Sequence, residues 1–147
     1  MRNALMVLTG ITMICACSSP IGPIAGGALE GTQHPWPADW RFTNDVPDVL
    51  LQTNPAKPYS VTLWMVVDNN QPYVAAASAD ARWVRNLQAD PQVILSVEGK
   101  LYPGTITRVT ERDEIERVIA AYLVKYEIDS REDFVQEGGQ LFRLVPP

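Results

Sequence analysis

Residues 59–68 read YSVTLWMVVD, a stretch of β-branched and aromatic residues that predicts one long strand. The turn residues DNNQ follow at 68–71, and a second apolar stretch, PYVAAAS, follows at 72–78. The segment DVLLQT at 48–53 predicts a shorter strand before them. Together these segments predict a meander of three strands.

Downstream, the segment DARWVRNLQADP at 80–91 predicts a short helix that ends at proline. The segment QVILSVEGKLYPGTITRV at 92–109 then predicts a hairpin that turns at 98–100, and GQLFRLV at 139–145 predicts a last strand. Pro103 and Gly104 lie inside the second hairpin strand, which indicates an edge or a bulge there.

A longer helix lies between the hairpin and the last strand. Thr110 and Asp113 form the pattern of a capping box at its start. Apolar residues then recur at helical spacing: Ile115, Val118, Ile119, Tyr122, Leu123 and Tyr126. The order of elements, with hairpin-length links, predicts a mainly β (α+β) fold in which an antiparallel sheet closes into a small barrel with helices at its ends or side.

The N-terminus reads MRNALMVLTGITMICAC at 1–17, with one positive charge ahead of an apolar run that is too short to span a bilayer. This pattern predicts a secretory signal peptide at 1–16. Ile14, Ala16 and Cys17 resemble the lipobox of bacterial lipoproteins, which implies cleavage before Cys17 and lipidation of its sulfur. The chain would then be exported and lipid-anchored to a bacterial membrane, on the periplasmic or cell-surface side. Ordinary cleavage, which releases a free protein, is the alternative.

Residues 17–32 are rich in Ser, Gly, Pro and Ala, and we expect a flexible tether there, followed by one domain at 33–147. Within the arm, GALEG at 27–31 can add a short edge strand. Trp36 and Trp40 are expected to pack on the domain, because large aromatic side chains usually bury their area.

Composition limits the chemistry. The formal charge is −5, and removing Arg2 with the signal makes it −6, which argues against nucleic acid as a partner. With Cys15 removed and Cys17 lipidated, no cysteine remains in the domain, and the single histidine, His34, lies in the arm. No metal site and no catalytic side chain is therefore predicted. If the domain catalyses a reaction, we expect the reactive group to be a bound cofactor.

The short helix offers one place for such a cofactor. Ser78 or Asp80 can cap its start, and Arg82 and Arg85 are three residues apart, so they share one side. Unpaired N–H groups at a helix start attract anions, so these arginines can hold a phosphate. The alternative is that both arginines are simply solvated.

Two segments carry a family resemblance. Trp83, Asn86, Leu87, Ala89 and Pro91 match a helix of the form W-x-x-N-L-x-A-x-P, and a preceding strand matches at Leu63, Trp64, Val66, Val67 and Asp68. The stretch that contains them resembles the split β-barrel FMN-binding proteins related to pyridoxamine 5′-phosphate oxidase, within their deazaflavin-dependent nitroreductase-like branch. The resemblance covers about two thirds of the expected domain.

This resemblance implies a six-stranded antiparallel split barrel, often a homodimer, that binds FMN or a deazaflavin and a small-molecule ligand as an oxidoreductase. It places the phosphate among Lys57, Ser60, Thr62, Ser78, Arg82 and Arg85, and the ring beside Tyr59 and Trp64. The family's basic, glycine-containing turn is replaced here by TNPAK at 53–57, with Lys57 as its sole charge.

Two alternatives therefore stay open. The first is a lipid-anchored split barrel without a cofactor, which serves as a binding or structural module. The second is haem handling, known for relatives of this fold, which would require Tyr or Met as the axial ligand in this domain.

Overall fold

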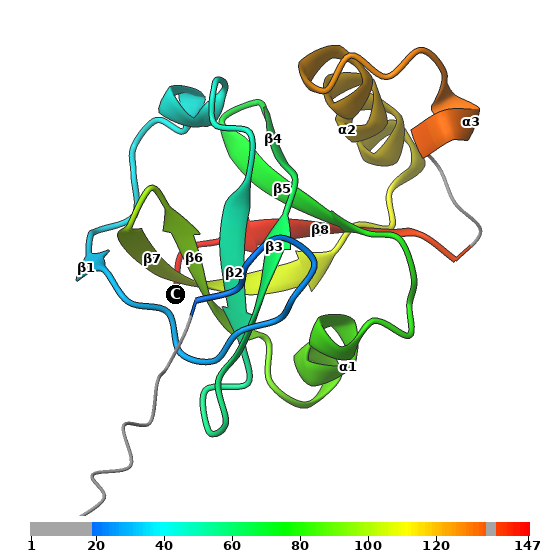
Figure 1. Ribbon diagram of the computed structural model, residues 1–147. Coiled ribbons are helices and arrows are strands. Elements are labelled where there is room, and N and C mark those ends of the chain that lie inside the picture. Colours follow the sequence, from blue (N-terminus) through cyan, green and yellow to red (C-terminus); the bar gives the residue numbers. More distant parts are fainter. Residues whose placement is uncertain (1–18, 135–137) are drawn as a thin grey trace, which may run out of the picture.

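The computed structural model describes residues 19–134 and 138–147 (Figure 1). The strands in these ranges form a single eight-stranded sheet, accompanied by three α-helices and one 3₁₀ turn at Arg41–Thr43. The strands are β1 (Thr32–Gln33), β2 (Val49–Thr53), β3 (Tyr59–Leu63), β4 (Met65–Asp68), β5 (Gln71–Ala76), β6 (Gln92–Val97), β7 (Lys100–Arg108) and β8 (Gln140–Val145). The helices are α1 (Arg82–Ala89), α2 (Arg112–Lys125) and α3 (Arg131–Phe134).

The strand order is β3-β2-β6-β7-β8-β5-β4, with β1 added in parallel to β7 and every other pair antiparallel. The two end strands, β3 and β4, are consecutive in the chain and are joined by Trp64 alone. The sheet must therefore curl until its two ends meet. The expected mainly β split barrel is confirmed.

One expectation about the strands is wrong. Residues 59–68 were expected to form one strand, but the chain breaks at Trp64 and the halves lie at opposite ends of the sheet order. Side chains of α2 satisfy the backbone at this break: the Tyr122 hydroxyl donates to the Trp64 carbonyl (3.1 Å), and the Lys125 ammonium donates to the Met65 carbonyl (2.7 Å). The Met65 N–H donates to the Tyr126 hydroxyl (3.0 Å). These bonds replace those that a neighbouring strand would supply.

Alternation along the strands separates two hydrophobic clusters. Met65, Val74 and Phe142 belong to the cluster inside the barrel. Their neighbours Val66, Tyr73 and Leu141 face the other side and pack with the buried face of α2. The second cluster holds α2 against the sheet, chiefly against β4.

The apolar stripe predicted from the helical spacing in α2 is confirmed, since Val118, Ile119 and Tyr122 are buried. The capping box is not formed: the N-cap is Glu111, and no side chain caps this helix. The reason is that the Val109 N–H still donates to the Leu141 carbonyl (2.9 Å), so the extended backbone runs past the end of β7 and the helix begins later than the pattern indicated.

The arm packs on the barrel. Trp40 is buried and contacts Trp36 edge to face at 5.0 Å between ring centroids, as expected. Gly26 exchanges two backbone hydrogen bonds with Ser60 (2.9 and 3.0 Å), and the Leu29 N–H donates to Gln52 Oε1 (2.7 Å). Gly26 and Leu29, which make these contacts, belong to the range 17–32 that the sequence predicts as a tether.

The expected edge strand at 27–31 is not formed; the bridge at Gly26 and strand β1 lie on either side of it. Pro103 pairs with Ile94 of β6, and no described strand pairs with it on its other side, so the expected edge position is confirmed. The signal peptide and Cys17 lie outside the described residues. Among those described, no helix is long and apolar enough to cross a membrane.

Candidate functional site

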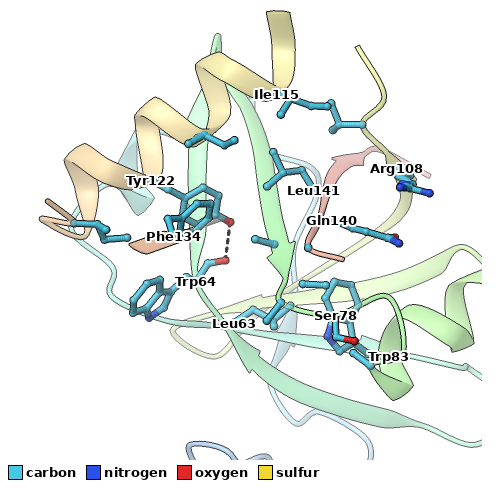
Figure 2. Close-up of a pocket in the computed structure, with 18 of the residues that line it drawn as sticks. Leu63, Trp64, Ser78, Trp83, Arg108, Ile115, Tyr122, Phe134, Gln140 and Leu141 are labelled. Carbon is cyan, nitrogen blue, oxygen red and sulfur yellow. Dashed lines mark hydrogen bonds between the residues drawn. The ribbon is translucent and has the colours of Figure 1, made fainter. Parts of the chain in front are cut away.

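A cavity of about 780 Å³ lies between the start of α1 and the helices α2 and α3 (Figure 2). Its size is within the range of about 300–1,000 Å³ that is typical of small-molecule sites. The sheet supplies its middle part through Ala75, Ala76 and Leu141, and α2 supplies Ile115, Ile119 and Tyr122. Most of the lining is therefore apolar, with a few polar groups at its margins.

Aromatic rings form one side of this cavity. Trp64, which is 46% exposed, stacks on Tyr126 with ring centroids 4.3 Å apart and planes at 9°. Phe134 of α3 stacks on Tyr122 at 4.7 Å, and burial raises the pKa of the Tyr122 hydroxyl well above its usual range. The Trp64 ring is thus held by a partner on one face while much of its surface stays open.

The start of α1 forms the opposite side. Ser78, Ala81 and Trp83 line the cavity, and Ala81 is the N-cap, which has no side-chain hydrogen bond to the helix. Neither Ser78 nor Asp80 caps the helix as expected; instead, the Asp80 N–H donates to Ser78 Oγ (3.1 Å). The first N–H groups of α1 are consequently left without a side-chain cap, which is the arrangement that attracts anions.

The structure brings together three of the residues expected to bind a cofactor: Thr62, Trp64 and Ser78 all line the cavity. Tyr59 and Arg82 meet beside it, because the Arg82 guanidinium lies 4.5 Å from the centroid of the Tyr59 ring. This contact is a cation–π pair and fixes the first arginine of α1 over strand β3.

The remaining expected residues lie away from the cavity lining. Arg85 is exposed on α1, and Lys57 is exposed in the turn between β2 and β3. Ser60 is fully buried, and its hydroxyl donates to the Gly27 carbonyl (2.8 Å). Of the three residues expected on the strand side of the phosphate site, only Thr62 therefore lines the cavity with Ser78.

Sequence reasoning missed three polar residues that line the cavity: Arg108, Arg131 and Gln140. Arg131 forms an ion pair with Glu116 of α2. Arg108 is the last residue of β7 and precedes the turn into α2, a position with no periodic signal. Tyr122, which belongs to the predicted apolar stripe of the longer helix, is both buried and part of the lining.

A polar cluster outside the cavity fixes α2 on the sheet. Glu114 accepts two hydrogen bonds from Arg143 (2.9 and 2.7 Å) and one from the Tyr73 hydroxyl (2.6 Å). The bond to Arg143 holds the pKa of the Glu114 carboxyl below its ordinary value. Burial, together with the bond to Glu114, raises the pKa of Tyr73 to about 12. The cluster thus links α2 to β5 and β8 near neutral pH.

No protein-family model matches the chain, and no curated protein matches its sequence. Solved structures do resemble it. HutZ, the heme storage protein from Vibrio cholerae, is 24% identical, with a TM-score of 0.59 over 73% of this chain and 86% of its own.

Two further structures are similar. A candidate pyridoxamine 5′-phosphate oxidase from Listeria innocua is 12% identical, with a TM-score of 0.56 over 72% of this chain and 88% of its own. An FAD-binding protein from Mesorhizobium loti is 14% identical, with a TM-score of 0.54 over 72% of this chain and 83% of its own. At such identities the likeness establishes the fold, a split barrel of the kind found in flavin- and haem-binding proteins.

Proposed function

We propose that this chain binds a flavin-type cofactor, FMN or a related deazaflavin, in the cavity between α1 and α2, and acts as an oxidoreductase-like protein. One observation carries the proposal: the uncapped start of α1 and the open face of Trp64 lie on opposite sides of a single apolar cavity. A phosphate and a planar ring joined by a short linker require that combination.

The residues present have separate roles in this proposal. Ser78 and the first N–H groups of α1 hold the phosphate, and Arg82 and Arg85 add positive charge to the same helix turn. Trp64 flanks the ring, and the apolar side chains of α2 exclude water from it. A bound flavin supplies the hydride and electron transfer that no side chain here can supply.

A titration of the full chain with FMN, followed through flavin fluorescence, tests the site. Ala77 is exposed and lines the cavity, so Ala77→Phe fills the space and is expected to abolish binding. Ala120→Phe, at an exposed position of α2 outside the lining, is the matched control and should bind as the wild type does. Equal affinities in the two variants would exclude this cavity.

The arginines need their own variants. Replacing both Arg82 and Arg85 with Ala is expected to weaken FMN binding at least tenfold, about 1.4 kcal/mol. Lumiflavin, which carries the same ring without a phosphate, should lose no affinity in this double variant. A loss shared by both ligands would show that the arginines do not act on the phosphate.

A cofactor-free module remains the second candidate. It is favoured by the position of Lys57 and Ser60 away from the cavity lining, because the phosphate then lacks two of the three residues expected on its strand side. Steady turnover of a reduced nicotinamide with an electron acceptor would contradict this candidate. Haem is not proposed: the described residues that line the cavity include no His, Cys or Met, and the hydroxyl of their one tyrosine, Tyr122, is already bonded to the carbonyls of Trp64 and Tyr73.

The chain is further proposed to be exported and anchored through Cys17. Mass spectrometry of membrane fractions should find acyl chains on Cys17, and Cys17→Ser should abolish them. Cys15→Ser is the control, because Cys15 leaves with the signal and its replacement should not prevent lipidation. A wild-type protein without acyl chains would contradict the anchor.

The family resemblance also supports a homodimer. Light scattering of the full chain in solution is expected to give twice the monomer mass of 16.3 kDa. A mass that stays at the monomer value across micromolar concentrations would contradict this proposal.

A further inference from the structure

The cavity has a second group of polar side chains near the start of α1, because Gln140 is paired with Ala76, two residues before Ser78. Arg108 and Gln140 line it there, on strands β7 and β8. In Figure 2 the two side chains lie on the same side of the cavity, and Trp64 lies on the other. Neither side chain was given a role in the proposed cofactor site, so their chemistry is a separate question.

The sheet register places the two side chains on one face. Arg108 is paired with Phe142 across β7 and β8, and Gln140 is two residues before Phe142 on the same strand. Side chains two apart on a strand point to the same side, and directly paired side chains do as well. Arg108 and Gln140 are therefore diagonal neighbours on the same face of the sheet as Phe142, and both line the cavity.

The charge of this polar group is not neutralised. No hydrogen bond or ion pair joins the side chain of Arg108 or Gln140 to any residue that the structure describes. The other lining cation, Arg131, is already paired with Glu116. Among the described lining residues there is no Asp or Glu, although the whole chain carries a net charge of −5. In this acidic protein, the charged residues among the described lining are thus all cations.

We propose that Arg108 and Gln140 bind the anionic end of a small apolar substrate, a molecule with a carboxylate, sulfonate or phosphate group on an aromatic or aliphatic body. The guanidinium donates paired N–H groups to two oxygens of such a group, and the Gln140 amide donates a further hydrogen bond. The apolar lining from α2 and the sheet holds the body. This inference rests on the proposed cofactor cavity and names the substrate class that the same cavity takes.

Two fluorescent probes that share one aromatic skeleton distinguish binding through the anionic group from binding to the apolar lining. The first, 8-anilinonaphthalene-1-sulfonate, is an anion, and N-phenyl-1-naphthylamine is its neutral counterpart. Both are titrated into the full chain without FMN. In Arg108→Ala the affinity for the anionic probe is expected to fall about tenfold, and the affinity for the neutral probe to stay within twofold. Gln140→Ala should give a smaller loss that is again confined to the anion.

Arg112→Ala is the matched control, because Arg112 is exposed at the start of α2 and outside the cavity lining. It should change neither affinity, whereas Ala77→Phe should block both probes. An Arg108→Ala variant that binds the anion as the wild type does would overturn the inference, and so would binding that Ala77→Phe leaves intact. If the probes behave as expected and FMN does not bind, the cofactor proposal fails, but the proposal that Arg108 and Gln140 bind an anionic group is supported.

Discussion

The hydroxyl of Tyr122 lies 3.1 Å from the backbone oxygen of Trp64 and donates a hydrogen bond to it. It also lies 3.2 Å from the carbonyl of Tyr73. Tyr122 is fully buried on α2, and Trp64 is the single residue between the two end strands of the sheet. One side chain therefore ties the helix to the place where the barrel divides, and it positions the aromatic side of the cavity.

Tyr122→Phe should destabilise the fold by about 1–2 kcal/mol, because the ring stays packed while a buried carbonyl loses its donor. Urea unfolding measures the change. Tyr59→Phe is the control, since no hydrogen bond of the Tyr59 hydroxyl is recorded among the described residues, and it should cost under about 0.5 kcal/mol. Equal losses in the two variants would mean that the Tyr122 bond does not stabilise the junction.

Glu114→Gln should cost about 2 kcal/mol at neutral pH. The side chain of Glu114 is only 12% exposed, and the substitution replaces charged hydrogen bonds to Arg143 with weaker neutral ones. The same unfolding experiment on Glu111→Gln gives the reference, because Glu111 is exposed at the N-cap of α2. A loss no larger than that of Glu111→Gln would contradict a stabilising role for the cluster.

The same carboxyl predicts a pH dependence. Its folded-state pKa lies below the ordinary value of 4.5, chiefly because of the hydrogen bond from Arg143. The stability it contributes is therefore fully present above about pH 4.5 and is lost as the pH falls through the lower folded-state pKa. The unfolding free energy of the wild type should fall more steeply with acid than that of Glu114→Gln. Parallel curves for the two proteins would refute this linkage.

Gly104→Ala should destabilise the barrel by about 2 kcal/mol, because a Cβ there would lie 2.6 Å from the Val145 carbonyl oxygen and 2.7 Å from the Trp36 ring. Gly27→Ala is the matched substitution, with no atom within 4 Å of the added carbon. The midpoint of thermal unfolding distinguishes them. An unchanged midpoint for Gly104→Ala would contradict the close approach of both Val145 and the Trp36 ring to Gly104.

Much of the fold could be predicted from the sequence, because strand and helix periodicities are local. The apolar stripe of α2 follows from the helical spacing of its residues alone. The break at Trp64 could not be predicted: the β-branched pattern continues across it, and the bonds that satisfy it come from Tyr122 and Lys125, about sixty residues later.

The candidate site was predictable only in part. Thr62, Trp64 and Ser78 were found because each is close in sequence to a matched motif. Ser60 is buried by a contact with Gly27 of the arm, a long-range event that no local pattern records. Arg108 and Gln140 come together through the pairing of β7 and β8, which only the folded sheet defines.

The central claim is that the cavity holds a flavin. The most direct measurement is the visible absorbance spectrum of the full chain after incubation with FMN and removal of unbound flavin by gel filtration. The account predicts a yellow protein that retains close to one flavin per chain, and an Ala77→Phe protein that retains none. A colourless wild-type protein after this treatment would contradict the claim.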